Sequence, residues 1–98
     1  MTTLLSARER SRLKARAHAL EPIIQIGHGG LTDTVAAEID RALTAHELIK
    51  LRAGSHERDA RRELFAEICT RTGAASVQEV GKVAVLWRPR PDETQDPG

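Results

Sequence analysis

Residues 22–32 read PIIQIGHGGLT, and this stretch decides how the chain folds. The apolar run at residues 23–26 predicts a strand, which ends at three glycines, and Thr32 then provides the N-cap of a helix. Glycines let another molecule approach the main chain closely, and a helix start adds unpaired N–H groups and a partial positive charge. The loop holds no nucleophile, lysine or metal-ligand set. The loop is therefore predicted to bind a phosphate-bearing partner rather than to form an active site.

Helical patterns lie on both sides of this stretch. Ser6 and Glu9 have the spacing of a capping box, which predicts a first helix that ends before Pro22. The second helix follows Thr32, and its apolar residues recur at helical spacing through residues 35–43. The loop is thus expected to lie between a strand and a helix, close to a further helix at the N-terminus.

The remaining elements complete an alternation of helices and strands. A third helix is predicted from a Ser55 cap to Gly73. Its expected buried side consists of Ala60, Leu64, Phe65, Ile68 and Cys69. Further strands are predicted at 47–52, 76–80 and 83–87, and Gly81-Lys82 suits a type II′ turn between the last two. Because helices separate the first three strands, we predict a two-layer α/β domain of order α-β-α-β-α-β-β with a mixed four-stranded sheet.

The composition suits one small domain. The 98 residues support a single domain, expected over residues 1–88, and the polar, proline-rich residues 89–98 are expected to form a disordered tail. The single cysteine, Cys69, excludes an internal disulfide and fits a reducing compartment. The N-terminus has no signal-peptide pattern, and no apolar run approaches the roughly 20 residues that span a bilayer. We therefore expect a cytoplasmic protein without membrane contact.

Positive charge gathers near the N-terminus. The net charge is only +1, but the first twenty residues hold five basic residues against one acidic residue. Arg8, Arg12 and Arg16 recur every four residues and predict a basic ridge on the first helix, and Lys14 adds a further charge. We expect this helix and the glycine loop to form a single electrostatic surface across the first strand, where it would steer an anionic partner.

The side-chain inventory narrows the possible functions. Phe65 and Trp87 are the only aromatic residues, so the chain cannot build the aromatic platform on which many RNA-binding modules stack bases. The histidines have no metal-ligand spacing, although His28 could donate to a phosphate from within the glycine loop. No acid, base and nucleophile converge in the sequence. We therefore expect no enzymatic activity, cofactor, metal or small-molecule substrate.

Several short motifs together resemble a known family. They are Leu13-Lys14, Ala17-His18, Leu20, Pro22, Gly27-x-x-Gly30-Leu31-Thr32, Glu47-Leu48-Ile49-Lys50 and Gly81-Lys82. This ordered set, which extends from about residue 5 to residue 89, is similar to the CRM domain (chloroplast RNA splicing and ribosome maturation). Among CRM proteins, the chain resembles the stand-alone bacterial YhbY-like members.

The resemblance implies both a fold and a function. It implies a fold similar to the C-terminal domain of translation initiation factor three, with sheet order 1-2-4-3. It also implies an RNA-binding loop analogous to the GxxG loop of KH domains, formed by Gly27, His28, Gly29 and Gly30, with Lys14 in the adjoining basic helix. Bacterial members are associated with precursors of the large ribosomal subunit.

We therefore expect a monomeric RNA-binding protein that acts in assembly of the large ribosomal subunit. It would bind ribosomal RNA precursors through the GxxG loop and the basic N-terminal helix. Lys50 and Arg52 share one face of the second strand and would make that face partly basic. The expected RNA contacts are Arg8, Arg12, Lys14, Arg16, Gly27, His28, Gly29, Gly30, Lys50 and Arg52. The alternative is a protein-interaction adaptor on the ribosome that uses the open sheet face.

Overall fold

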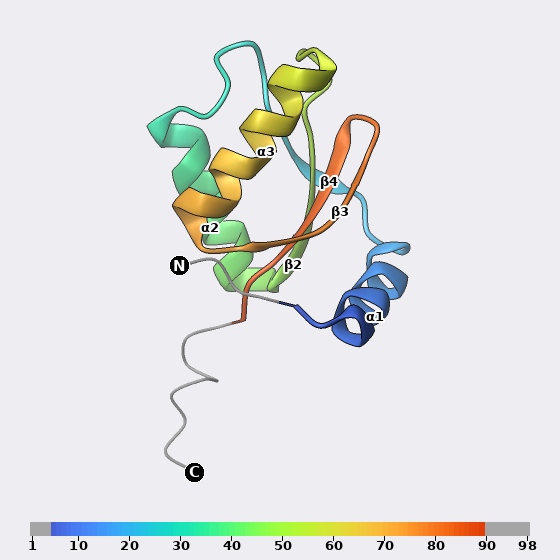
Figure 1. Cartoon of the computed structure of the whole chain (residues 1–98). Coiled ribbons are helices and arrows are strands. Elements are labelled where there is room, and N and C mark those ends of the chain that lie inside the picture. The colour runs from blue at the N-terminus through green and yellow to red at the C-terminus, as the bar shows by residue number, and fades with distance from the viewer. Residues whose placement is uncertain (1–4, 90–98) are drawn as a thin grey trace.

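The computed structural model describes residues 5–89, and it has the predicted order of helices and strands (Figure 1). The elements are α1 (Ala7–Ala17), β1 (Pro22–Gln25), α2 (Asp33–His46), β2 (Leu48–Arg52), α3 (Arg58–Thr72), β3 (Ala75–Val80) and β4 (Val83–Trp87). The four strands form one mixed sheet in the order β1-β2-β4-β3, as predicted. Most of the predicted tail, residues 90–98, lies outside the described residues.

Three of the four strands point in the same direction. β1 and β2 are parallel, β4 is antiparallel to β2, and β3 is antiparallel to β4. The carboxyl ends of β1, β2 and β3 therefore meet at one edge of the sheet, which we call the loop edge. It carries the glycine loop (residues 27–30), the β2–α3 connection (residues 53–57) and the turn at residues 81–82. α1 precedes β1 and so enters the sheet from the opposite edge.

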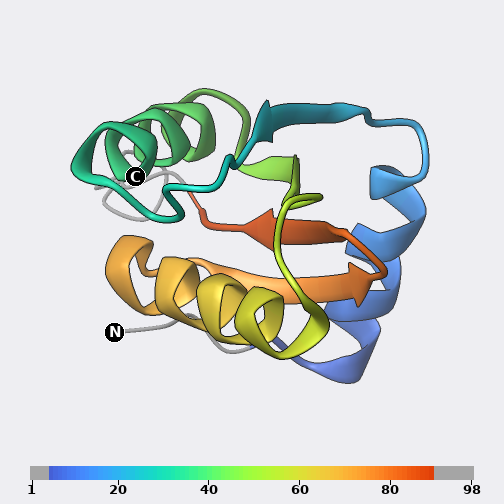
Figure 2. The same ribbon diagram turned by 90° about the horizontal axis from the view of Figure 1, so that it is seen from above.

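Helices cover both faces of the sheet (Figure 2). The larger core packs α2 and α3 on one face through residues such as Ile39, Phe65 and Ile68. The smaller core packs Leu13 and Ala17 of α1 on the other face. The predicted two layers thus describe the sheet with α2 and α3, whereas α1 adds a partial third layer. Leaving much of the second face to one short helix keeps part of that face open.

The helix starts that the sequence predicted for α1 and α2 are present. The Ser6 hydroxyl accepts a hydrogen bond from the Glu9 amide at 3.1 Å, and the Glu9 carboxylate accepts one from the Ser6 amide at 3.0 Å. The backbone hydrogen bond to Ser6 lowers the pKa of the Glu9 carboxyl group. At α2, the Thr32 hydroxyl accepts from the Val35 amide at 3.2 Å. Both helices therefore begin where polar side chains satisfy otherwise unpaired amides.

The start of α3 differs from the prediction. Its N-cap is Glu57 rather than Ser55, and Ala60 is exposed instead of buried. The cause lies in the preceding chain, where the Ala53 amide donates to the Lys82 carbonyl at 2.8 Å and keeps the main chain beside β4 beyond the end of β2. The chain therefore needs the whole 53–57 connection to turn back onto the sheet.

The junction between α2 and β2 also differs from the prediction. Glu47 was expected to be the first residue of the second strand, but it is the C-cap of α2, with a φ of 66°. Its amide donates to the Leu43 carbonyl at 2.8 Å, which completes the last helical turn. Positive φ is uncommon for a residue with a side chain. The chain adopts this conformation to pass from α2 directly into β2.

Arg88 ties the end of β4 to α2 and α3. Its guanidinium group donates to the Asp40 carboxylate at 2.6 Å and to the Thr72 carbonyl at 2.8 Å. Two further hydrogen bonds join it to the Asp40 carbonyl at 3.1 Å and the Thr44 hydroxyl at 3.0 Å. The Arg88 side chain is only 17% exposed. One side chain thus satisfies acceptors on two helices at the edge opposite the loop edge.

We expect Arg88→Ala to lower the free energy of unfolding by about 2 kcal/mol, because it removes four hydrogen bonds and leaves the Thr72 carbonyl unpaired. Urea denaturation measures the difference. The control is Arg41→Ala, at an exposed position of α2, which should stay within about 0.5 kcal/mol of the parent. Equal stability of the two variants would contradict the role assigned to Arg88.

Candidate nucleic-acid interface

The glycine loop forms a tight turn at the loop edge. The Gly30 amide donates to the Gly27 carbonyl at 3.1 Å, which places His28 and Gly29 at the exposed tip. The backbone amides of these two residues make no hydrogen bond within residues 5–89. Two main-chain donors are therefore available to an anion at the tip of the loop.

The fold does not explain why two of these residues are glycines. Gly30 has a φ of +69°, which glycine adopts without the strain that a side chain would bring. Gly27 and Gly29 lie outside the left-handed region. A Cβ atom at Gly27 would meet nothing within 4 Å, and one at Gly29 would meet only the Thr32 methyl group at 3.7 Å. The missing side chains instead leave the main chain open to close approach by a ligand.

The start of α2 contributes less than the sequence suggested. The Val35 amide is not available to a ligand, because it already donates a hydrogen bond to the Thr32 hydroxyl. Asp33 lies in the first turn, where its carboxylate accepts a hydrogen bond from Arg71 and interacts favourably with the helix dipole. A phosphate would compete with this carboxylate. The exposed tip of the loop is therefore the better anion site than the helix terminus.

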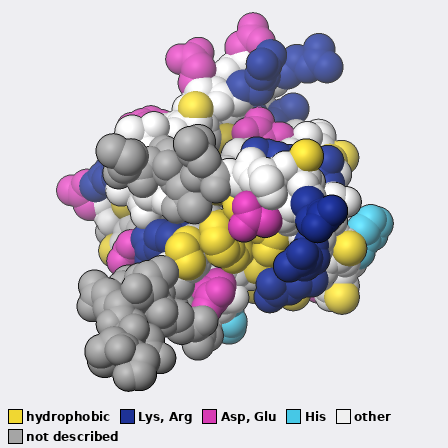
Figure 3. Space-filling view, turned by 60° about the horizontal axis from the view of Figure 1, so that its bottom comes forward, with side chains coloured by type: hydrophobic (Ala, Val, Ile, Leu, Met, Phe, Trp, Pro, Cys, Tyr) yellow, Lys and Arg dark blue, Asp and Glu magenta, His cyan; other side chains and the backbone are white. Residues whose placement is uncertain are grey.

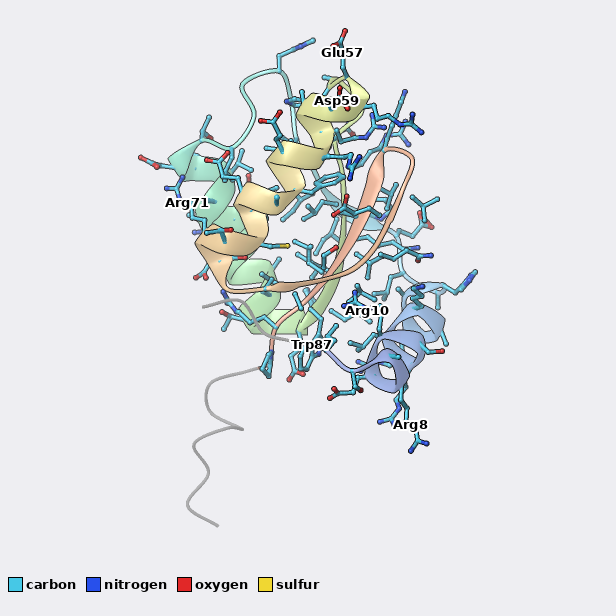
Figure 4. The ribbon with its side chains drawn as sticks, in the orientation of Figure 1. Arg8, Arg10, Glu57, Asp59, Arg71 and Trp87 are labelled. Atoms are coloured by element: carbon cyan, nitrogen blue, oxygen red, sulfur yellow. The ribbon has the colours of Figure 1, made fainter. Side chains whose placement is uncertain are left out.

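The predicted single surface of α1 and the glycine loop is wrong. Arg8 points away from the loop edge in Figure 4. Arg12 and Arg16 line a groove with Glu47 and Trp87, at the edge opposite the glycine loop. The physical reason is connectivity, because β1 joins the end of α1 to the glycine loop and its four residues span about 13 Å.

Four of the five basic residues of α1, namely Arg8, Arg12, Lys14 and Arg16, are exposed, but they do not share one side of the helix. Lys14 lies two residues from Arg12, about 200° around the helix axis, so it occupies the opposite flank. Figure 3, which brings the α1 side toward the viewer, shows Lys and Arg side chains gathered beside hydrophobic surface. The ridge of Arg8, Arg12 and Arg16 is thus a separate basic surface.

Lys50 and Arg52 lie on the face of β2 that α1 partly covers, opposite the buried Leu51. They have different surroundings. The Lys50 ammonium group donates to the Leu20 carbonyl at 3.0 Å and so fixes the connection between α1 and β1. Arg52 is exposed at the end of β2 and belongs to the loop edge. Only Arg52 of this pair is therefore near the glycine loop along the sheet.

The sequence interpretation missed His56. This half-buried side chain packs beside the glycine loop, with its Nε2 atom 3.8 Å from the position of a Cβ at Gly30. Its Nδ1 atom is buried and has no hydrogen-bond partner among the described residues. The strand directions could have revealed the contact, because parallel β1 and β2 bring the residues that follow them to the same edge.

The described residues offer binding groups rather than reactive ones. No three histidine, cysteine, aspartate or glutamate side chains within residues 5–89 are placed to hold a metal ion. Burial raises the pKa of the Cys69 thiol to about 11, so this thiol is a poor nucleophile at neutral pH. No helix in residues 5–89 is long and apolar enough to cross a membrane.

Comparisons with known proteins show which proteins this chain resembles. A "Probable RNA-binding protein" of Pseudomonas aeruginosa is 39% identical over 87 residues, which cover 89% of this chain and 84% of that protein. An "RNA-binding protein" of Haemophilus influenzae is 41% identical over 87 residues, covering 89% of this chain and 88% of the relative. The solution structure of a Staphylococcus aureus protein is 31% identical, with a TM-score of 0.77 over 88% of this chain and 90% of that chain.

The similarity extends over nearly all of the described chain. The model of the CRS1/YhbY (CRM) domain matches residues 5–88. CRM-domain RNA-binding proteins are non-catalytic, which agrees with the prediction that this chain is not an enzyme. The chain belongs to the CRS1/YhbY (CRM) domain family.

Proposed function

We propose that this protein binds RNA through the glycine loop and acts in assembly of the large ribosomal subunit, with ribosomal RNA precursors as its partner. One observation carries the proposal, namely that Gly27 and Gly29 are glycines although the fold leaves room for a side chain at both. The names of the Haemophilus and Pseudomonas relatives support the RNA-binding part. The assembly role rests on the resemblance to bacterial CRM proteins.

Recognition at this loop would act mainly on the phosphate backbone. The free amides of His28 and Gly29 would donate to phosphate oxygens, and the His28 imidazole would add a donor. Base stacking is a weak contributor here, because Phe65 is buried and Trp87 lies at the opposite edge of the sheet (Figure 4). The protein would therefore select RNA by backbone shape more than by base sequence.

The basic ridge of α1 would contact a different RNA segment from the one at the loop. Arg8, Arg12 and Arg16 are exposed, and none of them forms an ion pair within residues 5–89. Because the ridge and the loop lie at opposite ends of β1, they would contact separate stretches of the RNA backbone. A folded precursor RNA offers several backbone segments, so both surfaces could be occupied at once.

The alternative function, a protein-interaction adaptor on the ribosome, has one observation in its favour. Ile23 and Val80 are large apolar side chains that remain 53% and 59% exposed. They lie on the two outer strands of the sheet, β1 and β3. Loss of ribosome association after RNA digestion favours the RNA-binding function, whereas persistence favours the adaptor.

We expect Gly27→Ala and Gly29→Ala to fold normally and to bind RNA about tenfold more weakly, as expected for the loss of one charge-assisted hydrogen bond. The double change of His28 and Gly29 to Asp should abolish binding, because two carboxylates would lie where phosphate binds. Fluorescence anisotropy with labelled oligouridine measures affinity, and thermal unfolding checks the fold.

The matched control for the double Asp variant places the same charge elsewhere. Ala45→Asp with Thr70→Asp adds two carboxylates at exposed positions in the last turns of α2 and α3. This variant should retain most of the RNA affinity. Unchanged affinity in a folded loop variant, or equal losses in loop and control variants, would contradict the proposed role of the loop.

The assembly role predicts where the protein sediments in cell extracts. It should travel with precursors of the large subunit more than with mature ribosomes, and the association should weaken as salt concentration rises. Cells that lack the protein should accumulate incomplete large subunits, most visibly in the cold. Sucrose-gradient profiles test both statements. Normal subunit ratios together with no enrichment in precursor fractions would refute the assembly role while leaving RNA binding intact.

A further inference from the structure

The loop edge carries a second group of basic side chains, of which the sequence interpretation considered only Arg52 as an RNA contact. These side chains come from the end of β2, from the first turns of α3 and from the β3–β4 turn. They are Arg52, Arg58, Arg61, Arg62 and Lys82. Because the strand directions place these three segments at the edge that also carries the glycine loop, the group lies at the same end of the molecule (Figure 1).

A series of contacts connects this group to the glycine loop. The His56 ring packs beside Gly30, with the 3.8 Å approach described above. The Arg61 guanidinium group donates to the His56 carbonyl at 3.0 Å. On the other side of the 53–57 connection, a Cβ at Gly54 would lie 3.5 Å from the Arg52 Nε atom and 3.8 Å from the Lys82 side chain. One connecting segment thus touches both the glycine loop and the basic group.

The three arginines of α3 are arranged along one groove. Arg58, Arg61 and Arg62 fall within about 100° around the helix axis. With Phe65 and Gly81 they line a groove of about 400 Å³ between α3 and the β3–β4 turn. Guanidinium groups suit this role because their planar donors match two phosphate oxygens at once.

The charges of this groove are not neutralised by ion pairs. The two ion pairs within residues 5–89 join Arg71 to Asp33 and Arg88 to Asp40, away from the groove. Acidic groups do border it, since Asp59 and Glu79 are among its lining residues and Glu57 and Asp59 lie at the same end in Figure 4. A phosphate is therefore expected along the arginine side of the groove.

We infer that the RNA strand gripped by the glycine loop continues across the 53–57 connection into a second phosphate site formed by Arg58, Arg61 and Arg62, with Arg52 and Lys82 beside it. This inference rests on the proposed function, and it names the path of the strand. The occupant is single-stranded RNA, held by its phosphates. The α1 ridge lies outside this path.

Two matched triple variants test the path. The α3 triple removes three charges at the loop edge by changing Arg58, Arg61 and Arg62 to Gln. The α1 triple removes three charges from the N-terminal helix by changing Arg8, Arg12 and Arg16 to Gln. Binding of labelled oligouridine is measured by anisotropy over a series of KCl concentrations. The α3 triple should weaken binding by about 10- to 100-fold and reduce the slope of log affinity against log salt by about 2. The α1 triple should change both quantities much less with this short probe.

A further variant separates loss of RNA contact from a change in the fold, because the Arg61 side chain also donates a hydrogen bond to the His56 carbonyl. Arg58→Gln with Arg62→Gln leaves that bond intact and should still weaken binding by about 5- to 25-fold. Replacing the same two arginines with lysine should restore most of the affinity, since the charge returns. Full affinity of the double Gln variant would overturn the inference.

The remaining outcomes separate the inference from the proposed function. Loss of binding in the His28/Gly29 double Asp variant, with full affinity in the α3 triple, would overturn the path and leave the glycine-loop function standing. A loss confined to the α1 triple would overturn the path in favour of the N-terminal helix. Full affinity of the double Asp variant would contradict the proposed function itself and the path with it.

Discussion

The shared direction of β1, β2 and β3 is the constraint on which the arrangement of every candidate contact depends. Because these strands end at the same edge, the glycine loop, the 53–57 connection and the β3–β4 turn become neighbours although they are far apart in the sequence. Parallel strands require long crossovers, and α2 and α3 supply them while burying the larger face of the sheet. The same connectivity places α1 at the start of β1, away from that edge.

The tip of the glycine loop takes no part in the side-chain contacts that stabilise the core and the opposite edge of the sheet. Large apolar residues such as Phe65 and Ile39 fill the core beneath α2 and α3, and Arg88 closes the opposite edge with four hydrogen bonds. At the loop edge, by contrast, the tip of the glycine loop is exposed and its two central amides are unpaired within the described chain. The stabilising contacts of Arg88 and the proposed RNA contacts therefore lie at opposite ends of the strands.

Much of the fold could be predicted from the sequence, because local signals agree with the final structure. The Ser6 capping box, the Thr32 cap and the two-residue turn at Gly81 all depend on neighbouring residues. Gly81 has the positive φ of 56° that a type II′ turn requires at this position. Errors arose where distant contacts override local preference, as at Ser55, where the pairing of Ala53 with Lys82 delays the start of α3.

The candidate site was harder to predict than the fold. The glycine loop could be proposed as a site because glycine spacing is a local signal. The strand directions predict further neighbours of the loop. They imply that α1 lies at the far end of β1 and that residues after β2 approach the loop, as His56 does. The rotation of Lys14 away from Arg12 could also have been worked out from helix geometry alone. The burial of a single His56 nitrogen atom could not, because it depends on packing between two loops.

Arg10 has a consequence for how copies of this protein behave toward one another. β3 is an outer strand of the sheet, and such a strand exposes backbone groups that can pair with a strand of another molecule. The Arg10 guanidinium group donates to the Ser76 and Val77 carbonyls, where the pairing register of β3 is irregular. A charged side chain and a bulge are both features that discourage intermolecular strand pairing. Through Arg10, the N-terminal helix thereby also discourages aggregation by strand pairing at β3.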